Sequence, residues 1–145
     1  MPFQFTLATL LRVRESIEKR EEIALQRAEA EVVRARQQIE ELTSRIAHAA
    51  EAREKALQAP IKAHELQNME AELNAVVAAR TALIQRLQVL KEQREAQMKR
   101  YQAAYSNRQM LTDLSTQQRN EYEQEETRAQ QKRIDDIFAA RMQRS

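Results

Sequence analysis

Apolar residues recur along the first half of the chain in alternating steps of four and three, which is the heptad spacing of a coiled coil. The row is regular from Ala28 onward, and we call such a row of inward-facing heptad positions a seam. Before Ala28 the apolar positions drift, which indicates a stutter or local unwinding. The regular part is Ala28, Val32, Ala35, Ile39, Leu42, Ile46 and Ala49, and the drifting part is Leu7, Leu10, Leu11, Ile17, Ala24 and Leu25.

A second seam begins at Leu66 and continues with the same steps to Leu111. Beyond Leu111 its positions turn polar, and apolar character returns only near the C-terminal end. Arginines at seam positions either extend their charged ends to water or loosen the pairing where a partner binds. The second seam is Leu66, Met69, Leu73, Val76, Arg80, Leu83, Leu87, Leu90, Arg94, Tyr101, Ala104, Arg108 and Leu111, followed by Ser115, Gln118, Tyr122 and Glu125.

The two seams are separated by LQAPIKAHEL, which holds the only interior proline of a chain without glycine. Pro60 cannot donate to a continuing helix ladder and disfavours the helical conformation at Ala59. Two apolar helices joined by a short breaker fold back as an antiparallel pair. We therefore predict an all-α fold, a long antiparallel two-helix coiled-coil hairpin. Residues pair where their numbers add up to about 120, which places Leu42 near Ala78 and Ala35 near Gln85.

We expect one coiled-coil domain over residues 1–145, with a second helix longer than the first. Thr6 can cap the first helix. That helix then runs out opposite about Leu114, where the second seam loses its apolar residues. The expected parts are a helix at about 6–58, a turn at about 59–63 and a helix at about 64–142, with an unpaired overhang from about 115.

Composition agrees with long helices rather than a compact domain, since 32% of the residues are charged and only 4% are aromatic. The formal net charge of +2 is close to balance, so no large field of one sign is present. Without cysteine there is no disulfide framework. The start of the chain does not resemble a signal peptide, and no run approaches a membrane span. These features favour a cytoplasmic location.

Enzyme chemistry is poorly supported. A phosphate-binding loop needs glycine, and a two-helix rod has no pocket in which to hold a nucleophile against a base. His48 and His64 fall too far apart in the hairpin to share a metal ion. We expect no enzymatic activity, no cofactor and no metal.

Partner binding is the more promising function. The basic residues alternate with Glu and Gln, and aromatic stacking platforms are missing, so nucleic-acid binding is disfavoured. Phe3 and Phe5 lie outside the seam, and an apolar group lies on the overhang. These residues can pack on each other, and they can form a docking end for another protein, and the two interpretations are compatible. The apolar group is Ile134, Ile137, Phe138 and Met142.

Two terminal motifs resemble the FliJ family, the small coiled-coil component of the bacterial flagellar type III export apparatus. The first is FQFTLATLLRVRE at residues 3–15, an F-x-F motif followed by L-L-x-x-R. The second is QQKRIDDIFAAR at residues 130–141, in which a basic pair precedes an aliphatic residue, two acids and apolar residues. The hairpin and the longer second helix are similar as well.

This resemblance implies a non-enzymatic, stalk-like rod within the ring of the export ATPase FliI. It also implies contact with the export gate protein FlhA, escort of export chaperones, a monomeric free state, and a cytoplasmic location peripheral to the inner membrane. The ring contact falls on Phe3, Phe5, Arg12, Ile134, Asp135, Asp136, Phe138 and Arg141, and the gate contact on Gln38, Leu42, Ala49, Leu73 and Val77. This chain has AAEAR and NAVVAAR where family members can show aromatic residues near the gate contact.

Two alternatives stay open at this stage. The hairpin suits the stalk protein of a virulence type III secretion system, which need not share the terminal motifs. It also suits a generic coiled-coil scaffold or homodimer without a link to an ATPase. The mass of the protein in solution separates the last alternative from a monomeric stalk.

Overall fold

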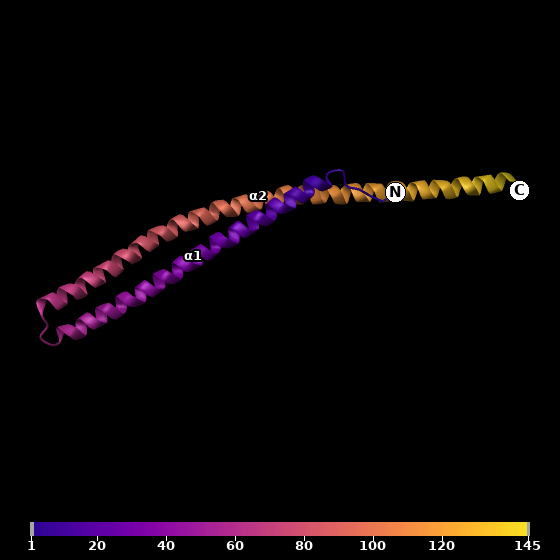
Figure 1. Cartoon of the computed structure of the whole chain (residues 1–145). Coiled ribbons are helices and arrows are strands. Elements are labelled where there is room, and N and C mark those ends of the chain that lie inside the picture. Colours follow the sequence, from indigo (N-terminus) through magenta and orange to yellow (C-terminus); the bar gives the residue numbers. More distant parts are fainter. Residues whose placement is uncertain (1, 145) are drawn as a thin grey trace. The chain divides into compact units, whose positions relative to one another are not determined.

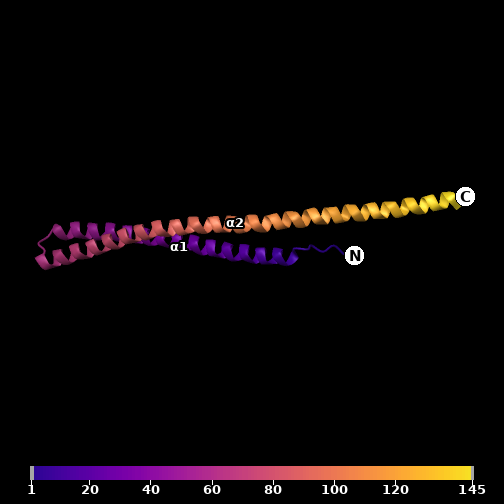
Figure 2. The same cartoon turned by 90° about the horizontal axis from the view of Figure 1, so that it is seen from above.

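The computed structural model describes residues 2–144, and nearly all of them lie in two helices. Helix α1 is Ala8–Leu57, and helix α2 is Ala63–Arg144. The two helices run antiparallel and are joined by one short connection (Figures 1 and 2). The predicted all-α hairpin with a longer second helix is confirmed.

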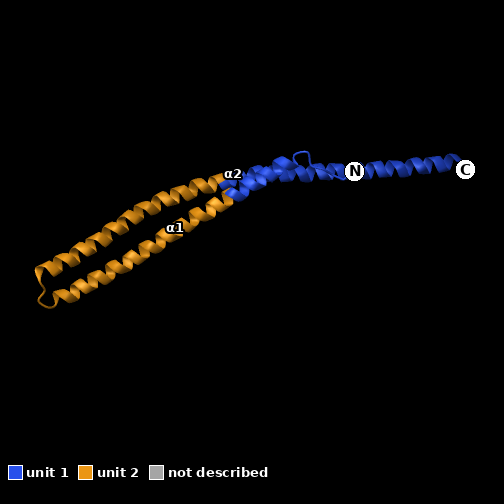
Figure 3. Ribbon diagram, in the orientation of Figure 1, with its two compact units in different colours: residues 1–20, 101–145 blue, residues 21–100 orange. Residues whose placement is uncertain are grey.

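The chain divides into two compact units, which are coloured separately in Figure 3. Unit 1 combines residues 1–20 with residues 101–145, so it contains the start of α1 and the end of α2. Unit 2 is residues 21–100 and contains the connection between the helices. A single domain stays a prediction.

The connection in unit 2 occupies the segment around Pro60, where the sequence predicts the break. The last turn of α1 tightens as the amides of Gln58 and Ala59 donate to carbonyls three residues back, at 3.3 and 3.4 Å. Beyond Pro60, the Lys62 carbonyl accepts from the amides of Glu65 and Leu66 and starts α2. Pro60 lies outside both helices, so its missing N–H removes no bond from either ladder.

The core of unit 2 is small and lies at the predicted seam positions. Val32, Ala35 and Leu90 are buried in one cluster, and Leu87 packs against it. The seam residues from Ala28 to Ala49 on α1, and from Leu66 to Arg94 on α2, are all buried or half-buried. The alternating spacing therefore identified the contact face of both helices.

The start of α1 keeps the same spacing, so the predicted stutter is wrong. Leu11, Arg14 and Glu18 are half-buried in steps of three and four, and Glu21 and Leu25 follow in the same steps. The apolar pattern drifts because charged residues occupy three of these five positions. The helix itself is regular throughout this stretch.

Pairing in unit 1 reaches further along α2 than the expected limit near residue 115. Residues 2–5 precede α1 and are not helical, and Phe3 reaches Tyr122. The helical pair Glu18 and Arg108 already has numbers that add up to 126, and those of Phe3 and Tyr122 add up to 125, so the longer reach follows from a register offset from the expected sum of about 120. Residues 123–144 are all exposed, and no other described segment of unit 1 runs beside the end of α2 in Figure 3.

Candidate functional site

The N-terminal residues 2–7, which we call the strap, lie against α2 in unit 1 through an aromatic contact. The ring of Phe3 is 5.7 Å from that of Tyr122, centroid to centroid, and the rings are tilted by 47°. The guanidinium carbon of Arg119 lies 5.5 Å from the centroid of the Phe3 ring. Both arrangements are attractive, because the faces of aromatic rings are electron-rich. Phe3 therefore has its interaction partners within the same chain.

Tyr122 is the α2 residue whose ring the strap contacts. Burial of its hydroxyl raises the pKa of Tyr122 above its usual 10.0, because the charged phenolate is poorly solvated there. The hydroxyl also donates to Glu126 Oε1 at 3.1 Å, which raises the pKa further. The neutral phenol is thus the form that fits this surface.

The exposed end of α2 carries a row of large apolar side chains, Ile134, Ile137 and Phe138, which we call the terminal row. Their exposed fractions are 54%, 56% and 64%. Ile134 follows Tyr122 by about three helical turns, roughly 18 Å along the axis, so the strap and the terminal row do not pack on each other. The expectation that the N-terminal aromatic residues and the apolar group at the end of α2 pack on each other is thus wrong.

The terminal row also faces away from the seam. At about 100° per residue, Ile134 and Phe138 lie roughly 140° and 180° around α2 from the mean direction of Gln118 and Tyr122, the last half-buried seam residues, and Ile137 lies roughly 80° from it. Therefore the row is not a continuation of the surface that pairs with α1 and the strap. An apolar row on a separate helix face is typical of a docking surface.

Charged residues of the predicted ring contact surround these apolar groups. Arg12 on α1, together with Asp135, Asp136 and Arg141 on α2, is exposed. Asp135 accepts from Gln131 Nε2 at 3.1 Å along its own helix. The eight predicted residues thus fall into an N-terminal group and a C-terminal group on different parts of unit 1.

Polar residues link the two helices inside the seam, which the sequence did not reveal. In unit 1, Arg108 donates to both carboxylate oxygens of Glu18, with Nε–Oε2 at 2.5 Å and Nη2–Oε1 at 3.2 Å. The side chains are each only 18% exposed. The bonds to Glu18 raise the pKa of the Arg108 guanidinium, which also lies 5.0 Å from the Tyr105 ring centroid. This pair is bidentate and well positioned.

Unit 2 has polar links of the same kind. Gln97 donates to the carboxylate of Glu21 and, at 3.1 Å, to its backbone carbonyl. Arg80, one of the seam arginines, donates to Thr43 Oγ1 at 2.8 Å. The seam arginines Arg80 and Arg108 thus bind the opposite helix. A search of the sequence for Glu on one seam opposite Arg or Gln on the other could have identified the Glu18–Arg108 and Glu21–Gln97 links.

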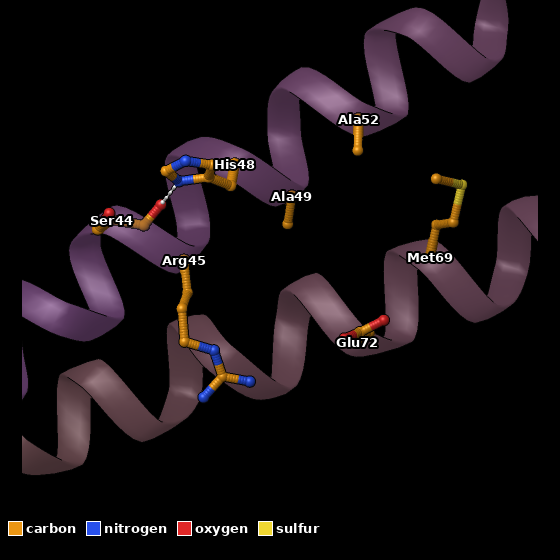
Figure 4. A pocket seen from close by; sticks show the side chains of 7 residues that line it. All are labelled: Ser44, Arg45, His48, Ala49, Ala52, Met69 and Glu72. Carbon is orange, nitrogen blue, oxygen red and sulfur yellow. Dashed lines mark hydrogen bonds between the residues drawn. The ribbon is translucent and has the colours of Figure 1, made fainter.

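The predicted gate residues are divided between the seam and the surface of unit 2. Leu42, Ala49 and Leu73 are half-buried between the helices, whereas Gln38 and Val77 are exposed. Ala49 borders a groove of about 520 Å³ between α1 and α2, shown in Figure 4. The residues lining the groove are Ser44, Arg45, His48, Ala49, Ala52, Met69 and Glu72.

The histidine in this groove has a local structural partner. A ring nitrogen of His48, Nδ1, lies 2.7 Å from the Ser44 carbonyl, which accepts its hydrogen (Figure 4). Among residues 2–144, no group of three or more His, Asp and Glu side chains is placed to hold a metal ion. No helix in this described part of the chain is long and apolar enough to cross a membrane.

The fold defines a helical-hairpin coiled-coil protein with exposed apolar residues near the end of its longer helix. The family model for the flagellar FliJ protein matches residues 3–145, nearly the whole chain. The chain belongs to the FliJ family, and it is a component of the flagellar export apparatus. Comparisons with curated proteins and with solved structures gave no match.

Proposed function

We propose that this chain is the stalk-like component of the export ATPase FliI, that it promotes assembly and activity of the ATPase ring, and that it has no catalytic activity itself. The main support is the terminal row, because three large apolar side chains stand exposed on a helix face that the hairpin does not use. Membership of a family of export-apparatus components supplies the context.

Stimulation of an ATPase by such a chain requires unequal contacts with the ring subunits. A ligand shifts a conformational equilibrium only by the difference in its affinity for the two states. The end of α2 has apolar residues on one face and seam residues on another, so subunits around it would meet different surfaces. This asymmetry lets a non-enzymatic helix bias the subunits toward different conformations.

Replacing Ile137 and Phe138 together by alanine should weaken binding to the ATPase ring on the order of ten- to a hundredfold, because two exposed apolar side chains lose their burial at the interface. Most of the stimulation of ATP hydrolysis at sub-saturating concentration should disappear. The measurement is the ATPase rate of the ring across a titration of each protein.

The matched control is Val33→Ala with Val89→Ala, which truncates two exposed apolar residues of unit 2. It should stimulate like the unchanged protein, and circular dichroism should show equal helix content for all variants. If the unchanged protein itself fails to stimulate the ring, the stalk assignment is wrong.

We also place the contact with the export gate protein FlhA in unit 2, around Gln38 and Val77. These two predicted residues are exposed, whereas Leu42, Ala49 and Leu73 are half-buried and would support the contact surface by packing between the helices. Export chaperones are further proposed partners, on the strength of the family alone. Binding to these partners would hold the protein peripherally at the inner membrane.

Gln38→Ala combined with Val77→Ser should reduce capture of the cytoplasmic part of FlhA by about tenfold or more, since one apolar and one polar contact are lost. Capture of FliI, measured in parallel, should stay unchanged. Val33→Ser serves as the control, because Val33 is an exposed valine of the same unit. Equal capture of FlhA by both variants would remove Gln38 and Val77 from the gate contact.

A further inference from the structure

The position of Phe3 bears on the ring contact. Phe3 is assigned to that contact by the family resemblance, yet its ring already packs on Tyr122 and beneath Arg119. Phe3 and Phe5 are both half-buried. A partner protein can use the full surface of Phe3 only after the strap leaves α2.

We propose that the strap is a releasable latch: it docks on the α2 surface around Arg119 and Tyr122 in the free protein, and it detaches when the ATPase ring binds. The inference rests on the proposed function for its partner, whereas the docked state is a property of the free chain alone.

The strap is held in a way that permits release. Among the described residues, no hydrogen bond between two backbone atoms joins the strap to α2. The backbone bonds near its end, from Ala8 N to the Phe5 carbonyl at 3.1 Å and from Leu11 N to the Leu7 carbonyl at 2.9 Å, belong to the start of α1. Docking therefore depends on side-chain contacts, chiefly those of Phe3. Release would break these contacts without disturbing either helix.

Release would also change which surfaces are available. It would free Phe3 and Phe5 for a partner, and it would uncover the ring of Tyr122, the last half-buried seam residue of α2. Tyr122 lies on a different side of α2 from Ile134 and Phe138. The ring could then contact α2 on two faces, whereas the docked strap leaves it the terminal row alone.

The first test concerns docking in the free protein and follows the titration of Tyr122. Its pKa is raised mainly by burial, so Phe3→Ala should lower that pKa toward 10.0, with the hydrogen bond to Glu126 retained. Because docking of the strap raises the pKa of Tyr122, docking is favoured while Tyr122 is protonated, below pH about 10, and this contribution is lost as the pH rises through the raised pKa. Carbon-13 NMR of the three tyrosines resolves Tyr122.

Leu10→Ala is the control for this titration, because Leu10 is an exposed apolar residue near the start of α1. It should leave the Tyr122 pKa unchanged. A Tyr122 pKa that is the same in Phe3→Ala and in the unchanged protein would overturn docking of the strap.

The second test concerns release and uses the absence of cysteine from the chain. Gln4→Cys and Glu123→Cys place thiols next to Phe3 and Tyr122, and both native residues are exposed. A flexible bis-maleimide spacer that contains a disulfide should join them and hold the strap on α2. We expect the bridged protein to stimulate the ATPase at least fivefold less than the unchanged protein. A reductant that cleaves the spacer should restore the stimulation.

The outcomes separate the latch from the stalk assignment. Full stimulation by the bridged protein overturns release, while the stalk assignment stands. Absence of stimulation by the bridged, reduced and unchanged proteins alike overturns the stalk assignment and the role of release in it. Glu123→Cys alone, treated with the same reagent, should stimulate the ATPase normally. A loss of stimulation by this single variant would show that the reagent on Glu123→Cys, and not restraint of the strap, causes the effect, which would overturn release.

Discussion

Leu90→Ala should lower the free energy of unfolding by about 2–5 kcal/mol, the usual cost of truncating a buried leucine to alanine. Leu90 is 6% exposed and packs with Val32 and Ala35, and Leu87 supports this cluster. The described residues include few buried side chains, so little other core is present to absorb the loss. Because small proteins are stabilised by only about 5–15 kcal/mol, the variant should be near its limit of folding.

Urea unfolding followed by circular dichroism measures this effect. Val89→Ala is the matched control, because Val89 is the preceding residue on α2 and is 42% exposed. It should change stability by less than about 1 kcal/mol, as surface substitutions usually do. Equal losses for the two variants would show that the cluster around Val32 does not stabilise the hairpin.

Glu18→Leu and Arg108→Leu should each lower the unfolding midpoint, because each leaves an unpaired charge in the seam. The double variant should recover much of the loss and can exceed the unchanged protein, since two leucines pack well at facing seam positions. The pKa of Arg108 is raised, so on the alkaline side the contribution of the pair persists through neutral pH and is lost as the pH rises through that raised value.

The polar pair should also determine how the chain associates. A polar group at a seam position selects register and oligomeric state at some cost in stability. Sedimentation equilibrium should give the monomer mass of 17.0 kDa for the unchanged protein and a mixture of monomer and larger species for the double variant. A strictly monomeric double variant would show that the pair contributes to stability alone, and a dimeric unchanged protein would favour a scaffold over a stalk.

The hairpin could be predicted because its signals are local and repetitive. Pro60 identifies the break, and the four-and-three spacing from Ala28 onward identifies the face that each helix buries. Both follow from the fixed geometry of an α-helix, so they need no knowledge of the rest of the structure.

The strap could not be predicted by the same arithmetic. The estimate that pairing ends near residue 115 assumed that the numbers of paired residues add up to about 120. Those of Glu18 and Arg108 add up to 126 and those of Phe3 and Tyr122 to 125, so the register is offset and Phe3 reaches Tyr122. Heptad spacing identifies the contact face of each helix but does not determine this offset.

The polar seam of α1 was missed for a related reason. A search for apolar periodicity passes over Arg14, Glu18 and Glu21, although these residues occupy inward positions. Their partners, such as Arg108 and Gln97, lie far away in the sequence and are recognised only when the register of the hairpin is known to within a residue or two.

The placement of the terminal row on the far side of α2 from its pairing face has a consequence for how this chain can evolve. Substitutions of Ile134, Ile137 or Phe138 change the surface that α2 offers to a partner and do not change the side chains that pack between the two helices. Partner preference and folding can therefore drift separately in this lineage. A binding defect caused by a substitution in the terminal row is expected to be suppressed by compensating changes in the partner protein rather than within the hairpin.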